Sequence, residues 1–107
     1  MINKKIGGLL GLARKAGKVV FGTEGTMEAI RRKQVKLIIV AQDAAPRTKK
    51  NFMQIAEQMQ IPISIYGTIE ELSNCIGQQN KAILGIKEIH FSEEIIKIMN
   101  NGGEMIG

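Results

Sequence analysis

The chain has 107 residues, of which 44% are hydrophobic and 23% charged, so it is expected to form one globular domain rather than two domains or a disordered chain. The single cysteine excludes an internal disulfide and a cysteine-based zinc site, and no run approaches the roughly 20 apolar residues of a membrane span. The formal net charge is +5, and the charged residues are unevenly distributed. Residues 1–53 hold twelve Lys or Arg and three Asp or Glu, whereas residues 54–107 hold three Lys and seven Glu. A basic half attracts phosphate, although basic side chains also simply solvate a surface.

The first predicted elements are a helix, a short strand and a second helix. Helical spacing of apolar residues predicts an amphipathic first helix that ends at Gly17; these residues are Ile6, Leu9, Leu10 and Ala13. Because Arg14 and Lys15 interrupt the apolar run, we interpret it as a helix of the mature protein and not as a signal peptide. The run Val19–Phe21 favours a strand, and residues 24–33 favour a helix with Met27 and Ile30 on one face.

The middle of the chain predicts a strand, a loop and a third helix. The continuous apolar run 37–41 is typical of a strand that is covered on both faces. A loop is expected at 42–47, containing Pro46, and the third helix follows with Phe52 and Met59 on its apolar side.

The last part of the chain predicts two further strand–helix pairs. Residues 63–66 alternate as a strand, and Thr68 with Glu71 forms a capping box for a short helix through Ile76. A polar loop at 77–81 leads to a strand at 82–86. Ser92 is expected to cap a final helix that stops at 101–103. We therefore expect one domain over 1–101 and a frayed tail over 102–107.

This alternation of helices and strands predicts an α/β fold with helices on both faces of one sheet. The fold class expected is a three-layer α-β-α sandwich with a four-stranded mixed sheet.

Catalytic signatures are weak in this sequence. His90 is expected to be a loop or capping residue, and Cys75 to be a buried structural cysteine. Neither a serine nucleophile elbow nor a phosphate-binding Walker loop occurs. Gly7, Gly8 and Gly11 lie inside the first helix, where they are expected to let a neighbouring element pack closely. We therefore predict a protein that is not an enzyme and that uses no cofactor and no metal.

Basic residues and one glycine turn are better candidates for function. Arg31 and Arg32 lie at the end of the second helix, where they either complement the helix dipole or contact an anion. Lys49 and Lys50 lie at the start of the third helix. Contact with phosphate and simple exposure to solvent explain these two lysines equally well. Gly22 lies where the chain turns from a strand into the N-terminus of a helix, and the free N–H groups of that N-terminus suit an anion.

Three segments carry a resemblance to a known family. They are GLARKAGKVVFG at 11–22, VKLIIVAQDAAPRT at 35–48, and LSNCIG at 72–77 followed by KAILGI at 81–86. In order and spacing they resemble the bacterial stand-alone members of the L-seven-Ae/L-thirty-e ribosomal protein family. The resemblance covers nearly the whole chain and implies the same α-β-α sandwich.

The resemblance also implies a partner, kink-turn RNA, which is a sharply bent helix with tandem sheared G·A pairs. The family's G-x-N-E-x-x-K motif falls on Gly22 to Glu28, with Glu24, Gly25 and Glu28 at the Asn, Glu and Lys positions. Two further contact regions are implied, the turn before the third helix and the loop after the fourth. The RNA-binding residues expected are Lys18, Gly22, Thr23, Glu24, Gly25, Thr26, Glu28, Arg31, Arg32, Ala44, Ala45, Pro46, Gln78, Gln79 and Lys81.

The sequence leaves three functions open. The first is a cytoplasmic, monomeric protein that binds structured RNA, either kink-turn or ribosomal RNA, and associates with no membrane. The second is a protein-interaction module on the same fold that has lost kink-turn binding. The third is an enzyme, which would have to depend on His90 or Cys75.

Overall fold

A four-stranded mixed sheet forms the middle layer of the computed structural model, which describes residues 2–102. The strands are β1 (Val19–Phe21), β2 (Leu37–Val40), β3 (Ile63–Ile65) and β4 (Ile83–Ile86), and their order in the sheet is β1-β4-β2-β3. Strand β4 is antiparallel to both β1 and β2, and β3 is parallel to β2.

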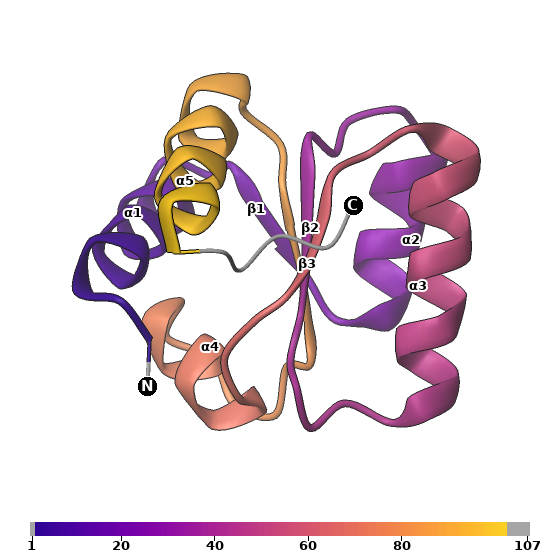
Figure 1. Ribbon diagram of the computed structural model, residues 1–107, viewed down its shortest axis with the longest axis horizontal. Helices are drawn as coiled ribbons and strands as arrows, with labels where there is room; N and C mark the ends of the chain where they lie inside the picture. The colour runs from indigo at the N-terminus through magenta and orange to yellow at the C-terminus, as the bar shows by residue number, and fades with distance from the viewer. Residues whose placement is uncertain (1, 103–107) are drawn as a thin grey trace.

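Helices cover both faces of this sheet (Figure 1). One face carries α1 (Lys4–Lys15), α4 (Ile69–Cys75) and α5 (Ile89–Gly102), and the other carries α2 (Thr23–Arg31) and α3 (Pro46–Met59). The predicted three-layer α-β-α sandwich is confirmed, and so is the predicted order of its elements. The capping box of α4 is also present, with the Thr68 hydroxyl and the Glu71 carboxylate each accepting from the other's amide.

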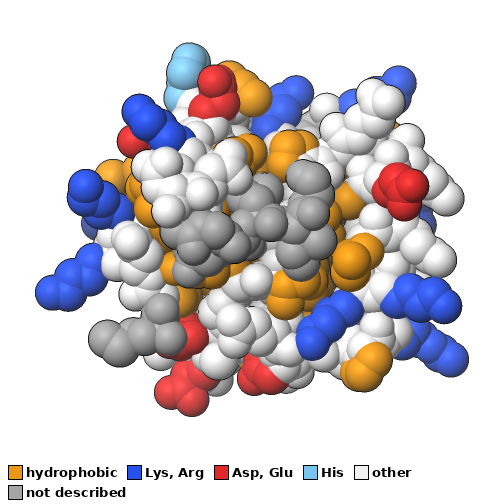
Figure 2. Space-filling view, viewed as in Figure 1, with side chains coloured by type: hydrophobic (Ala, Val, Ile, Leu, Met, Phe, Trp, Pro, Cys, Tyr) orange, Lys and Arg blue, Asp and Glu red, His pale blue; other side chains and the backbone are white. Residues whose placement is uncertain are grey.

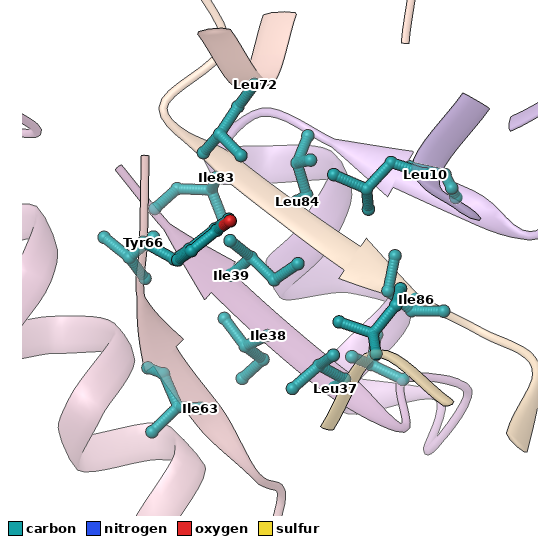
Figure 3. Packing of buried hydrophobic residues seen from close by; sticks show 14 of the residues in the cluster. Leu10, Leu37, Ile38, Ile39, Ile63, Tyr66, Leu72, Ile83, Leu84 and Ile86 are labelled. Atoms are coloured by element: carbon teal, nitrogen blue, oxygen red, sulfur yellow. The ribbon is translucent and has the colours of Figure 1, made fainter. Parts of the chain in front are cut away.

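The core lies on both faces of β2, whose four residues are fully buried. Figure 3 shows Leu10 of α1 and Leu72 of α4 beside the sheet residues Leu84 and Ile83. The continuous apolar run therefore predicted this strand correctly. The strand predicted at 63–66 is also present, as β3 at Ile63–Ile65, and both Ile63 and Ser64 are buried in it.

Three glycines of α1 were expected to allow close packing. Helix α4 lies against two of them: the Cys75 sulfur and the Cys75 carbonyl oxygen are each 3.5 Å from where a Cβ would stand at Gly7 and Gly11, respectively. Gly8 has open space around it. Helix α4 therefore packs against two of the three glycines, but at ordinary van der Waals distances that would leave room for a methyl group at either. Cys75 itself is half-buried, not fully buried.

The predicted start of the last helix is wrong. Helix α5 begins at Ile89, so Ser92 lies inside it, buried, with its hydroxyl donating to the Glu88 carbonyl oxygen (2.9 Å). The Glu88 carboxylate accepts from the amides of His90 (3.0 Å) and Phe91 (2.8 Å) and thereby caps the helix. A glutamate side chain can satisfy the free amides of a first turn as serine does, and sequence rules favour the shorter side chain.

Smaller differences concern other element ends. Helix α2 spans Thr23–Arg31, not 24–33, and α3 already begins at Pro46, inside the loop predicted at 42–47. Proline suits the first position of a helix, where its missing N–H would have no partner. Of the predicted frayed tail, residues 103–107 lie outside the described part of the chain, and Gly102 ends α5.

Gly85, in the middle of β4, is predicted to tolerate no side chain. A Cβ at this position would stand 2.8 Å from a methyl carbon of Val20 and 3.1 Å from that of Thr26, in the layer between the sheet and α2. Gly85→Ala is expected to lower the free energy of unfolding by about 1–3 kcal/mol, because overpacking forces neighbouring groups apart. Urea unfolding measures this. The control is Gly8→Ala, in a helix with open space, which is expected to stabilise the protein by ~0.5–1 kcal/mol.

Glu88 is predicted to make stability depend on pH. Amide donation from His90, and then from Phe91, holds the pKa of Glu88 below its ordinary value of 4.5. The stabilisation is therefore complete above pH 4.5 and is lost as the pH falls through the lowered pKa. Glu88→Gln is expected to lower stability at pH 7 and to weaken the acid-side decline in thermal melts. An unchanged decline, equal to that of a Glu93→Gln control, would contradict the capping role.

Candidate nucleic-acid interface

One end of the sheet gathers four loops. Strands β1, β2 and β3 end there and β4 begins there, because β4 runs antiparallel to its two neighbours. We call this region the loop end; it comprises residues 22–25, 42–47, 67–69 and 77–81 and lies toward the bottom of Figure 1. Backbone hydrogen bonds tie the loops together: Gly22 donates to Ile83 (2.9 Å) and Gln42 donates to Gly67 (2.7 Å).

The turn from β1 into α2 depends on Gly22. Its backbone has φ 83° and ψ 163°, a conformation that is essentially restricted to glycine. This conformation turns the chain directly into the first turn of α2, where Thr23, Glu24 and Gly25 are exposed. Because Gly22 has no side chain to cap the helix, the free amides of this first turn face the loop end.

The loop between β2 and α3 is held against α4. The Asp43 carboxylate accepts from the Ile69 amide (2.8 Å), the first residue of α4. Ala44 is buried beneath this loop, whereas Ala45 and Pro46 are exposed and Arg47 follows in the first turn of α3. In Figure 2, Lys and Arg side chains gather over the lower part of α3.

The loop between α4 and β4 is fixed by a buried serine. The Ser73 hydroxyl accepts from the Lys81 amide (2.8 Å) and donates to the Lys81 carbonyl oxygen (3.3 Å). Beside this loop lies a groove of about 480 Å³. Seven of its eight lining residues carry an amide, carboxylate or hydroxyl group, and the lining comprises Asp43, Ile69, Glu70, Ser73, Asn74, Gln78, Gln79 and Asn80.

A charged stripe continues from the loop end along α2. Glu24, Glu28 and Arg32 are four residues apart and therefore follow one another on one side of the helix. The Glu28 carboxylate is bound by Arg32 Nε at 3.0 Å and by Arg31 Nη1 at 3.7 Å. These side chains are more than half exposed, so the pairs contribute little stability, but they compensate the charge of Glu28.

The structure brings together most of the predicted RNA-binding residues, but not all. The side chains of Thr26 and Ala44 are buried, and Thr26 faces Gly85. Lys18 lies at the opposite end of the sheet, where its carbonyl oxygen accepts from the Lys87 amide (2.8 Å). Arg31 and Arg32 stand at the far end of α2. The remaining predicted residues lie at the loop end or on the α2 stripe: Gly22, Thr23, Glu24, Gly25, Glu28, Ala45, Pro46, Gln78, Gln79 and Lys81.

Phe21 and Arg14 were not predicted as site residues, yet they contact each other and Phe21 contacts Lys81. Phe21, the last residue of β1, has the Arg14 guanidinium over its ring at 5.3 Å from the centroid and the Lys81 ammonium at 5.5 Å. Arg14 comes from the last turn of α1 and Lys81 from the loop before β4. Because their contact depends on the fold, local sequence patterns give no signal for it.

The candidate catalytic residues lie in unrelated places. His90 is exposed near the opposite end of the sheet, where its Nδ1 lies 2.8 Å from the Glu88 carboxylate. Burial, and secondly the charge of Glu71, raises the pKa of the Cys75 thiol and so favours its less nucleophilic protonated form. Across residues 2–102, no cluster of three or more His, Cys, Asp or Glu side chains could hold a metal ion. In the same range, no helix combines the length and apolarity needed to cross a membrane.

Comparisons with known proteins identify the family and the relatives of this chain. Residues 4–96 match the ribosomal protein L7Ae/L30e/S12e/Gadd45 family. RNA-binding protein YlxQ of Enterococcus faecium is 33% identical over 86 residues, which cover 80% of this chain and 82% of that protein. RNA-binding protein YlxQ of Bacillus subtilis is 26% identical over 92 residues, covering 86% of this chain and 92% of that one.

Solved structures have the same fold. A protein of unknown function from Bacillus halodurans aligns with a TM-score of 0.88 and 31% identity, over 92% of this chain and 99% of that one. The Giardia lamblia 15.5kD RNA binding protein aligns with a TM-score of 0.77 over 94% of this chain and 90% of that one. Its identity is 15%, so this second likeness concerns the fold alone.

Gly22 is predicted to be needed for the shape of the loop end. Gly22→Ala is expected to lower the free energy of unfolding by about 1–3 kcal/mol, because alanine is strained at its φ and ψ. Gly25→Ala, three residues later in a helix with open space, is expected to raise it by ~0.5–1 kcal/mol. Urea unfolding of both variants tests this, and equal effects would show that the conformation of Gly22 is not what matters.

Proposed function

Because the chain belongs to the ribosomal protein L7Ae/L30e/S12e/Gadd45 family, we propose that it is a non-enzymatic RNA-binding protein that holds a kink-turn RNA at its loop end. The observation that carries the proposal is the convergence of three features at one end of the sheet. These are the uncapped start of α2, the exposed turn at Ala45 and Pro46, and the loop at 77–81. The names of the relatives in Enterococcus and Bacillus support RNA as the partner.

The start of α2 supplies recognition of both a phosphate and a base. Its free amides suit a phosphate oxygen. The exposed Glu24 carboxylate can accept from the N–H groups of guanine, and Gly25 lets the RNA approach the backbone closely. Unpaired bases are commonly recognised through their exposed edges, and the neighbouring amide-lined groove offers Asn74, Gln78 and Gln79 for such contacts.

Two arginines on α2 compensate the negative charge of Glu28, which would otherwise repel RNA. Glu28 stands where the family motif has a lysine, and a bare carboxylate there would repel phosphate. Arg31 and Arg32 bind this carboxylate, so the stripe carries a net positive charge beyond Glu24. In the proposed complex, the arginines contact the RNA backbone from the far end of α2, and Lys18 contributes only to long-range attraction.

We further propose that the RNA is ribosomal or another structured cytoplasmic RNA, and that the chain binds it as a monomer. A sharply bent RNA suits the loop end, because shape and a few exposed base edges are what such a surface can recognise.

Titration of a labelled kink-turn RNA, against a straight duplex of equal length at two salt concentrations, tests this function. Preference for the bent RNA is expected, with affinity falling as salt rises. Glu24→Gln is expected to reduce the preference more than the affinity, because it changes a base contact and not a phosphate contact.

The matched control is Glu93→Gln, an exposed acid in the first half of α5. Equal binding of both RNAs by the native protein would remove the kink-turn assignment and leave a general RNA-binding protein. Absence of binding at either salt concentration would contradict RNA binding and favour the protein-interaction module.

A further inference from the structure

The contacts of Phe21 distinguish it from an ordinary core residue. Its ring is half-buried at the end of β1, directly before the Gly22 turn, with one cation from α1 and another from the α4–β4 loop over it. Among residues 2–102, neither Arg14 nor Lys81 forms an ion pair with a carboxylate. Two positive charges are therefore held near one aromatic ring without compensation.

Arg14 is held in an unusual way. Its Nε is buried and has no hydrogen-bond partner among the described residues. An unsatisfied buried donor on a charged group is costly, and the ring of Phe21 offsets only part of that cost, since a cation–π contact contributes on the order of 1 kcal/mol. The ring, and not a carboxylate, thus orients the guanidinium, whose charge has no counter-ion among the described residues.

Lys81 is positioned by its backbone. The Ser73 hydroxyl forms hydrogen bonds with both the amide and the carbonyl oxygen of Lys81, which fixes Lys81 at the loop end. Its ammonium group then lies near the Phe21 ring while its neighbours Gln78 and Gln79 line the groove. Lys81 therefore contacts the Phe21 ring and also belongs to the loop end, the surface that is proposed to bind RNA.

We propose that Arg14, Phe21 and Lys81 form a phosphate-binding subsite that takes one phosphodiester of the bound RNA; this inference rests on the proposed function. Each cation lies within 5.5 Å of the centroid of the same ring, and a phosphate bound by both would neutralise their like charges. Phe21 is a positioning residue that holds both cations, and its cation-covered ring is not a stacking surface for a base. The subsite extends the loop end onto the α1 side of the sheet.

The salt dependence of kink-turn RNA binding tests the subsite. Each lost phosphate contact is expected to reduce the slope of log affinity against log salt by roughly 0.7–0.9. Arg14→Gln and Lys81→Gln are each expected to show this reduction together with weaker binding. Phe21→Leu, which keeps an apolar side chain but removes the ring, is expected to reduce the slope as well.

Two further variants separate this role from a merely structural one. Arg14→Lys keeps the charge and is expected to retain the slope while weakening binding, because lysine cannot offer the planar fork of arginine. Lys36→Gln removes an equal charge at the opposite end of the sheet, where the Lys36 amide bonds Ile86, and is expected to change the slope less. Thermal melts of every variant identify any that fails to fold.

The outcomes distinguish the subsite from the function. Native protein that binds kink-turn RNA, with unchanged slopes in folded Arg14→Gln and Lys81→Gln, would overturn the subsite and leave the function standing. A Lys36→Gln effect as large as that of Arg14→Gln would also overturn it, because only total charge would then matter. Native protein that binds no RNA would overturn both.

Discussion

The placement of β4 between β1 and β2 is the constraint on which the candidate interface depends. Because β4 is antiparallel to both neighbours, its first two residues, Ile83 and Leu84, pair with the last residues of β2 and β1, and parallel β3 ends at the same side. Hydrogen bonds from Gly22 to Ile83 and from Ala41 to Ala82 hold this arrangement where the loops begin. Loops far apart in the sequence are thereby brought to one end of the sheet on a rigid support.

Two glycines maintain this arrangement for different physical reasons. Gly85 is required by space, since a methyl group there would separate α2 from the sheet. Gly22 is required by backbone conformation, with open space around it but φ at 83°. One therefore sets the distance of α2 from β4, and the other sets the direction in which its free amides point. A functional surface made of backbone groups needs both conditions, because backbone amides cannot adjust as side chains do.

The fold was largely predictable from sequence because its signals are local. Helical spacing, the apolar run of β2 and the capping box at Thr68 each report on neighbouring residues, and each prediction was confirmed. Failures came where a less common group replaced the expected one, as when Glu88 caps α5 in place of Ser92. The candidate site was less predictable, because the contacts of Arg14 and Lys81 with the Phe21 ring exist only after α1 and β4 have packed beside β1.

Charge counts illustrate the same limit. The basic first half of the sequence does not form one face, since Lys18 lies at the opposite end of the sheet from Gly22 and Arg31 at the far end of α2. At the loop end itself, Glu24 and Asp43 lie among the cations, and Asp43 is committed to the Ile69 amide. A surface of mixed charge would bind RNA weakly if attraction alone decided affinity. Under the proposed function, selectivity therefore comes from where individual groups stand, and a few fixed contacts at the start of α2 and around Phe21 matter more than the total charge.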